Sequence, residues 1–336
     1  MGITVAKSAS VGWATAADSA CGCDRLIFKC PLWPEISNDE IVNWSAALRA
    51  NGLGNRGRQS IWCCDMRFFE LLKKKCHPAH FADPQSDIQP FPAEMIGSLP
   101  MIMDIGMNNG RDSLFYLQKG FRVIAVEANP VLVDMISLQL KNFVDSGQLI
   151  IEHVGLAGKE GEFVFYQNLD NDHWSSFHKE WGTRNNTQYR EIAVKCVLPQ
   201  MLFEKYGVPY YIKIDIEGND MEVVRALRDF PDRPRYISIE EHQVFYFAEL
   251  WSLGYRNFKL VNQRDLFKVK CPYPPREGRY VDVSFDGTTS GPFGEETPGE
   301  WMAFEQAVYK YLTEIRSPVR GFLAGNAWFD IHARLD

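Results

Sequence analysis

Small and acidic residues follow short apolar runs at several places in this 336-residue chain. The run Met101–Asp104 leads into a turn with glycines at 106 and 110, and a later run ends at Glu127. A glycine lets the main chain approach a ligand closely, and a carboxylate at the end of the next strand can accept both hydroxyls of a ribose. We therefore predict a nucleoside-binding site that includes Asp104, Gly106, Asn108, Gly110, Glu127 and Ala128.

The spacing of the two glycines indicates which nucleoside this is. Gly106 and Gly110 form G-x-x-x-G, whereas dinucleotide enzymes use G-x-G-x-x-G to cradle a pyrophosphate. S-adenosylmethionine (SAM) has no phosphate and carries positive charge, which suits an acid such as Asp104 before the turn. SAM is therefore the predicted cofactor. An NAD-dependent oxidoreductase, a non-catalytic SAM-binding domain and an ordinary strand-to-helix turn remain alternatives.

Candidate catalytic residues lie at the ends of two later runs. Asp215 and Glu217 close one run, and Glu240 and His242 close the next. Methyl transfer to an alcohol requires loss of the hydroxyl proton, and an imidazole titrates near neutrality, so His242 is a candidate general base. Asp215 could contact the amino group of SAM, or bind a magnesium-like ion with Glu240. The alternatives are that His242 caps a helix and that Glu217 is an N-terminal helix acid.

These residues must be positioned by a parallel sheet, because apolar runs alternate with helical patterns from Met101 to Val261. Within this α/β pattern, Lys213 lies on a buried strand and should pair with a carboxylate. The expected strands are Met101–Ile105, Arg122–Glu127, Leu149–His153, Tyr210–Asp215, Tyr236–Glu240 and Phe258–Val261. The expected helices are Arg111–Lys119, Pro130–Phe143, Asn219–Asp229 and Val244–Leu253.

Two excursions interrupt the alternation. Extra strands at Glu162–Gln167 and Glu191–Val197 flank a polar and aromatic segment, Asn168–Arg190, which is a candidate substrate lid. It contains His173, Trp174, His178 and Trp181, which could contact the acceptor. The second excursion, Pro272–Pro298, is rich in Pro and Gly. It leads into Thr297–Glu300, which fits a capping box for a helix that starts near Trp301.

Three motifs resemble the FkbM family of methyltransferases. They are Asp104–Gly110, Val126–Pro130 and the Tyr211–Gly218 segment with its K-I-D-I-E-G sequence. The resemblance implies a class I methyltransferase fold, with a mostly parallel seven-stranded sheet and helices on both faces, and usually O-methylation. It also implies that Asp104, Gly106 and Gly110 line the methionine part of SAM, that Glu127 holds the ribose, and that Val154 and Gly155 lie near the adenine.

Composition narrows the remaining possibilities. A net charge of -7 gives no general reason to bind nucleic acid or an anionic membrane. Six of the eight cysteines precede residue 80 without a C-x-x-C pair, which favours reduced thiols in a cytoplasmic protein over a zinc site at Cys76, His77 and His80. We expect a small-molecule acceptor; the oligomeric state is open.

Changes in residue composition and pattern along the chain predict three parts. Residues 1–97 form an irregular and helical N-terminal extension, residues 98–270 the SAM-binding domain, and residues 271–336 a C-terminal loop and helix that pack on it. Within the first part, Asp39–Ala50 and Met66–Lys75 have helical patterns, and Pro78–Pro92 is a predicted linker.

Overall fold

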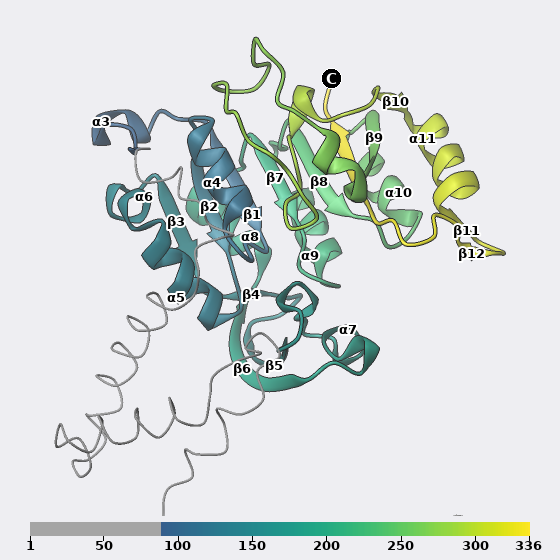
Figure 1. Cartoon of the computed structure of the whole chain (residues 1–336), viewed down its shortest axis with the longest axis horizontal. Helices are drawn as coiled ribbons and strands as arrows, with labels where there is room; N and C mark the ends of the chain where they lie inside the picture. The colour runs from purple at the N-terminus through teal and green to yellow at the C-terminus, as the bar shows by residue number, and fades with distance from the viewer. Residues whose placement is uncertain (1–88) are drawn as a thin grey trace, which may run out of the picture. The chain divides into compact units, whose positions relative to one another are not determined.

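The computed structural model describes residues 89–336, and these are built around an eight-stranded sheet (Figure 1). The strand order is β10-β9-β13-β8-β7-β1-β2-β3. Two earlier candidates, the helices at Asp39–Ala50 and Met66–Lys75, lie outside the described residues, as do six cysteines with His77 and His80. The strands are β1 Met101–Ile105, β2 Arg122–Val126, β3 Leu149–Glu152, β7 Tyr211–Ile214, β8 Tyr236–Glu240, β9 Asn257–Asn262, β10 Met302–Ala303 and β13 Phe329–Arg334.

Most of the sheet is parallel, as expected for a doubly wound α/β fold. β1 pairs in parallel with β2 and β7, and the pairs β2–β3 and β7–β8 are also parallel. β13 enters between β8 and β9 and is antiparallel to both. The eighth strand, one more than predicted, is the two-residue β10, which pairs with the edge of β9. The structure thus confirms the predicted class I architecture with one short edge strand added.

Side chains alternate between the two faces of each buried strand, and both faces are apolar. Helices therefore cover both faces of the sheet. On one face, Met103 and Ile105 of β1 belong to the apolar core formed with α8, α9, α10 and α11. On the other face, Ile102 packs with α4, α5 and α6. The helices are α3 Ala93–Ile96, α4 Arg111–Gln118, α5 Pro130–Gln139, α6 Lys141–Ser146, α7 Lys179–Gly182, α8 Pro199–Tyr206, α9 Asp220–Ala226, α10 Phe245–Ser252 and α11 Phe304–Lys310.

Local signals account for several helix ends. Asn129 caps α5 by accepting a hydrogen bond from the backbone N–H of Val131 at 3.1 Å, with Pro130 at the first position. Gly120 and Gly254 follow α4 and α10 with φ of +94° and +105°. The predicted helix Pro130–Phe143 is divided at Leu140, where φ and ψ are -102° and 26°.

A second, three-stranded sheet lies beside the main one, at the bottom of Figure 1. Its order is β4-β6-β5, and it carries the excursion that includes α7. The pairing of β5 with β6 is antiparallel and brings Asn168 opposite Tyr189, which closes the base of the excursion. The strands are β4 Gly155–Leu156, β5 Gly161–Asn168 and β6 Tyr189–Val197.

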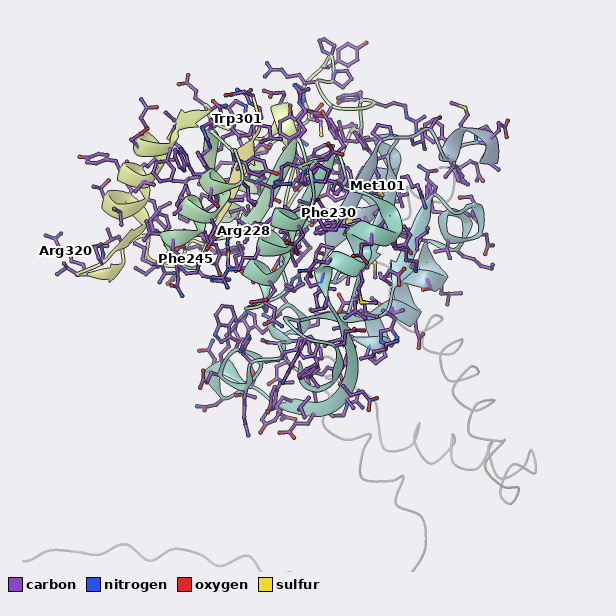
Figure 2. All side chains as sticks on the ribbon, turned by 180° about the vertical axis from the view of Figure 1, so that it is seen from behind. Met101, Arg228, Phe230, Phe245, Trp301 and Arg320 are labelled. Atoms are coloured by element: carbon purple, nitrogen blue, oxygen red, sulfur yellow. The ribbon has the colours of Figure 1, made fainter. Side chains whose placement is uncertain are left out.

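The predicted capping box at Thr297–Glu300 is wrong. α11 begins only at Phe304, and Trp301 lies outside it, because Met302 and Ala303 pair with β9 instead of entering the helix. The Thr297 hydroxyl donates to the carbonyl of Pro292 at 3.2 Å. After α11, a hairpin of β11 Arg316–Ser317 and β12 Gly321–Phe322 carries Arg320 at its tip, away from the main sheet (Figure 2).

Candidate active site

The candidate site lies where the strand order reverses. β1 is followed by β2 on one side of the sheet, whereas β7 lies on its other side. Ligands of open α/β sheets bind at such a switch point, beyond the carboxyl ends of the strands. The register pairs Asp104 with Lys213 and Ile105 with Ile214, so the loops after β1 and β7 emerge side by side.

The loop after β1 requires glycine. Gly106 has φ of +87°, and a Cβ built there would lie 1.8 Å from the carbonyl oxygen of Asp215. Lys213 Nζ donates to the Gly106 carbonyl at 2.7 Å. The β7 lysine and the glycine turn therefore hold each other in place.

A buried cluster of charged side chains packs beneath the glycine turn, on the side of the sheet core. Lys213 Nζ lies 3.4 Å from Asp104, 3.7 Å from Asp215 and 3.8 Å from Asp112. Asp104 is fully buried and also accepts a hydrogen bond from the Ser113 hydroxyl at 2.6 Å. Burial favours a lower pKa for Lys213, but the three carboxylates outweigh it and raise the pKa. The expected pairing of Lys213 is confirmed.

Glu127 occupies the end of β2 and organises the backbone around it. Its carboxylate accepts hydrogen bonds from the backbone N–H groups of Asn108 and Asn129, both at 2.8 Å. Burial raises its pKa, and these two N–H groups oppose the rise. Asn108 has φ of +47°, and its buried Oδ1 has no hydrogen-bond partner among residues 89–336. The loop thus presents a carboxylate and an unpaired amide oxygen to a ligand.

A small cavity of about 60 Å³ lies over these groups. Asp104 and Gly110 are buried and do not line it; Gly110 instead caps α4 and packs against Ile136. Phe177, from the excursion, lies over Gly155 and 4.9 Å from the ring of Phe165. The predicted cofactor-binding residues that do line the cavity are Gly106, Asn108, Glu127, Ala128, Val154, Gly155 and Asp215.

A larger cavity of about 580 Å³ adjoins the small one and shares Asn108, His173, Asp215 and Glu217 with it. Carboxylates from several elements line the larger cavity, together with two tryptophans. The residues not shared with the small cavity include Asp112, Trp174, Arg184, Lys213, Glu240, Gln263, Trp328 and Asp330. Two adjoining spaces at one strand-end edge can hold a donor and an acceptor next to each other.

The three predicted catalytic residues differ in their positions. Asp215 lines both cavities, and Glu240 lines the larger one, where burial raises its pKa. His242 lines neither; its Nε2 lies 3.4 Å from Glu240, and its ring packs 4.7 Å from that of Trp181. Burial lowers the pKa of His242, but Glu240 raises it to about 9. A protonated imidazole at neutral pH cannot take a proton, so we do not assign the base to His242.

The excursion 168–190 contributes to both cavities, through His173, Trp174 and Arg184 among others. Arg184 binds Glu217 with two hydrogen bonds and lies 4.8 Å from the ring centroid of Trp174. Burial raises the pKa of Glu217, whereas the two hydrogen bonds from Arg184 lower it because they stabilise the carboxylate. Glu217 is therefore an anchor of the excursion. Glu217 lies two residues before Asn219, the N-cap of α9, and its carboxylate binds Arg184 and does not cap the helix.

The loop 272–298 also reaches the site, which the sequence did not suggest. The Ser290 N–H donates to both oxygens of Asp112 at 3.0 Å, and Asn109 Nδ2 donates to the Thr288 carbonyl at 3.0 Å. Burial raises the pKa of Asp112 to about 6. The run of polar residues at 286–290, which follows the alternating apolar and polar residues of Val281–Phe285, is the only signal that could have indicated this contact.

Within residues 89–336, no group of three or more His, Cys, Asp or Glu side chains is arranged to hold a metal ion, so the suggested magnesium-like site at Asp215 and Glu240 gains no support. None of the helices in that part has the length and apolar character needed to cross a membrane.

The fold and the site together define a class I methyltransferase domain. A sequence model described as the methyltransferase FkbM domain matches residues 104–310, and the chain belongs to this family. A search of curated proteins finds no significant match to the sequence.

Three solved structures are similar to this chain. A precorrin-6y C5,15-methyltransferase from Geobacter metallireducens is 13% identical, with 73% of this chain and 86% of that one covered and a TM-score of 0.32. An FkbM methyltransferase from Methylobacillus flagellatus is 16% identical, with 57% and 46% covered and a TM-score of 0.31. An rRNA methylase from Streptococcus thermophilus is 10% identical, with 73% and 94% covered and a TM-score of 0.29. At these values the three structures say nothing of this chain's substrate.

Proposed function

We propose that this protein uses SAM to methylate a hydroxyl group of a small molecule. The observation that carries the proposal is the group of Asn108, Glu127 and Asp215 around one cavity at the switch point of the sheet. A buried carboxylate, an unpaired amide oxygen and a second carboxylate match the ribose hydroxyls and the ammonium group of SAM.

Each part of SAM has residues suited to hold it. Glu127 would accept hydrogen bonds from the ribose hydroxyls, and Asp215 would pair with the amino group. Val154 and Gly155 would contact the adenine. When bound, SAM supplies an electrophilic methyl group on a sulfonium; the chain's own residues orient the acceptor, exclude water and take up a proton.

The small cavity, at about 60 Å³, is less than the 300 Å³ or more that pockets for small ligands commonly provide. Phe177 occupies space beside Gly155 where the adenine would lie. We therefore expect Phe177 and its segment of the excursion to shift when the cofactor binds, while Arg184 and Glu217 hold the rest of the excursion in place.

The test is isothermal titration calorimetry of the full chain with SAM and with S-adenosylhomocysteine. We expect both to bind, and NAD not to bind. Binding of NAD alone would reverse the proposal in favour of the oxidoreductase. The acceptor type is then tested with methyl-labelled SAM on alcohols and on the matching amines; methylation of the amines alone would exclude O-methylation.

A further inference from the structure

One part of the wall of the larger cavity comes from a strand that the family match does not include. β13 carries Asp330, and Trp328 lies just before it, whereas the match ends at residue 310. Asp330 lies opposite Glu240 of β8 and opposite Val261 of β9. β13 thus places the Asp330 carboxylate in the larger cavity, which Asp215 also lines.

Asp330 is buried and unpaired. It is 8% exposed, and no hydrogen bond or ion pair joins its carboxylate to another group of residues 89–336. The neighbouring acids have partners, because Glu240 faces His242 and Asp215 lies near Lys213. Burial, Asp215 and Glu240 raise the pKa of Asp330, with Asp112 adding to the rise and Lys213 opposing it.

A second unpaired group lies on the same wall. Gln263 is 3% exposed; its backbone N–H donates to the Trp328 carbonyl at 2.9 Å, but its side-chain Nε2 has no partner among the described residues. A buried donor without an acceptor destabilises the fold, so such groups are usually satisfied by a ligand or by water. A hydroxyl can donate to Asp330 and accept from Gln263 at the same time.

Two tryptophans give the cavity flat apolar surfaces. Trp174 reaches it from the excursion, and Trp328, which is 40% exposed, reaches it from the segment before β13. The ring of Trp328 packs against Gly287, where an added Cβ would lie 3.4 Å from it. Aromatic faces next to hydroxyl-binding polar groups suit a ring with apolar C–H faces and hydroxyl edges.

We propose that the larger cavity binds a hydroxylated ring, such as a sugar or cyclitol, and that Asp330 and Gln263 hold the hydroxyl that is methylated. This inference rests on the proposed function. In the transfer, the hydroxyl oxygen forms a bond to the methyl carbon, the methyl–sulfur bond breaks with its electron pair left on sulfur, and the hydroxyl proton passes to the Asp330 carboxylate.

The first experiment measures binding in the full chain saturated with S-adenosylhomocysteine. Saturation-transfer NMR is recorded with methyl α-D-glucopyranoside and myo-inositol, and with putrescine as a cationic probe for the acidic lining. We expect signals from at least one hydroxylated ring, and their loss in Gln263→Leu and Trp328→Ala. Binding of putrescine alone, or of none of the probes, would overturn the inference while leaving the calorimetric result for the cofactor unaffected.

The second experiment measures transfer from methyl-labelled SAM to the ring that binds. Asp330→Asn keeps the shape of the side chain but cannot take the proton, so we expect a rate at least about 100-fold lower, with the affinity for S-adenosylhomocysteine changed less than about two-fold. Asp232→Asn, on an exposed residue, is the matched control. An unchanged rate in Asp330→Asn, or no transfer by the wild-type protein to the bound ring, would overturn the role of Asp330.

Discussion

The guanidinium of Arg184 makes two hydrogen bonds with the carboxylate of Glu217, at 2.8 and 2.7 Å. This pair joins the middle of the excursion 168–190 to the loop after β7. Only 11% of the Glu217 side chain is exposed, so the pair is shielded from solvent and its geometry is that of the strongest charged hydrogen bonds. The excursion is therefore fastened to the same loop that carries Asp215.

Weakening this pair should release the excursion. Arg184→Lys keeps the charge but loses the planar fork, so we expect trypsin to cleave within residues 169–188 about ten-fold faster or more. Digestion is followed by mass spectrometry of the fragments. Arg320→Lys, at the exposed hairpin tip, is the control and should leave the cleavage rate in the excursion unchanged. Equal rates in both variants would contradict the anchoring role.

Glu127 should determine cofactor affinity. Glu127→Gln removes the charge from a group expected to accept the ribose hydroxyls, and hydrogen bonds to charged groups contribute about 1.5–3 kcal/mol. We expect SAM to bind about 10- to 100-fold more weakly by calorimetry. Glu162→Gln, on the exposed start of β5, is the control. Affinity within a factor of two of the wild-type value would exclude this role for Glu127.

Lys213 should be a stability residue as well as a site residue. Lys213→Met leaves Asp104 buried without its cation, and breaking a buried pair in this way costs about 3–5 kcal/mol. Urea unfolding measures the loss. The double variant Asp104→Asn with Lys213→Met should recover a large part of it. Lys141→Met, which breaks an exposed pair with Asp145, should change stability by less than about 0.5 kcal/mol. Equal costs at the two lysines would refute the buried cluster.

His242 should make stability depend on pH in the alkaline range. Its folded-state pKa is raised from 6.5 to about 9, so the stabilisation is complete below pH 6.5 and is lost as the pH rises through 9. Glu240, Asp220 and Glu217 are the charged groups that raise it. The full shift corresponds to about 3 kcal/mol, and partial solvent access reduces this to about 1–2 kcal/mol.

The measurement is urea unfolding of the wild type and of His242→Gln at pH 6 and at pH 9.5. We expect the difference in unfolding free energy between the two proteins to shrink at the higher pH. The exposed His153, changed to Gln, should show no such trend. A difference that grows with pH would mean that His242 is neutral in the folded protein.

The sequence predicted the central strands well because they are buried on both faces. β1 and β8 occur at the expected residues, since both runs are mainly apolar and end at turn signals. Glu127, Asn108 and Asp215 line one cavity, as their positions relative to strand ends suggested, because a strand end fixes where these side chains can reach. The glycine turn was informative because a side chain at Gly106 cannot fit.

β13 was not predicted because its composition hides its place in the sheet. In Phe329–Arg334 the polar Asp330 and His332 alternate with apolar residues, a pattern typical of a strand with one face in water. In the structure both polar side chains are buried, at 8% and 2% exposure. Only the pairing with β8 and β9, which are distant in sequence, decides this, and so Asp330, Trp328 and Gln263 could not be assigned to the site beforehand.

The position of β13 has a consequence for synthesis of the protein on the ribosome. β9 and β10 are joined to β8 only through β13, which is made more than 60 residues after β9. While the chain is still being translated, the half of the sheet from β3 to β8 can form, but β9 and β10 must wait and expose apolar surface. Chaperones that bind extended apolar segments would meet the chain at this stage, and the larger cavity, which Asp330 of β13 lines, would be completed only when β13 enters the sheet.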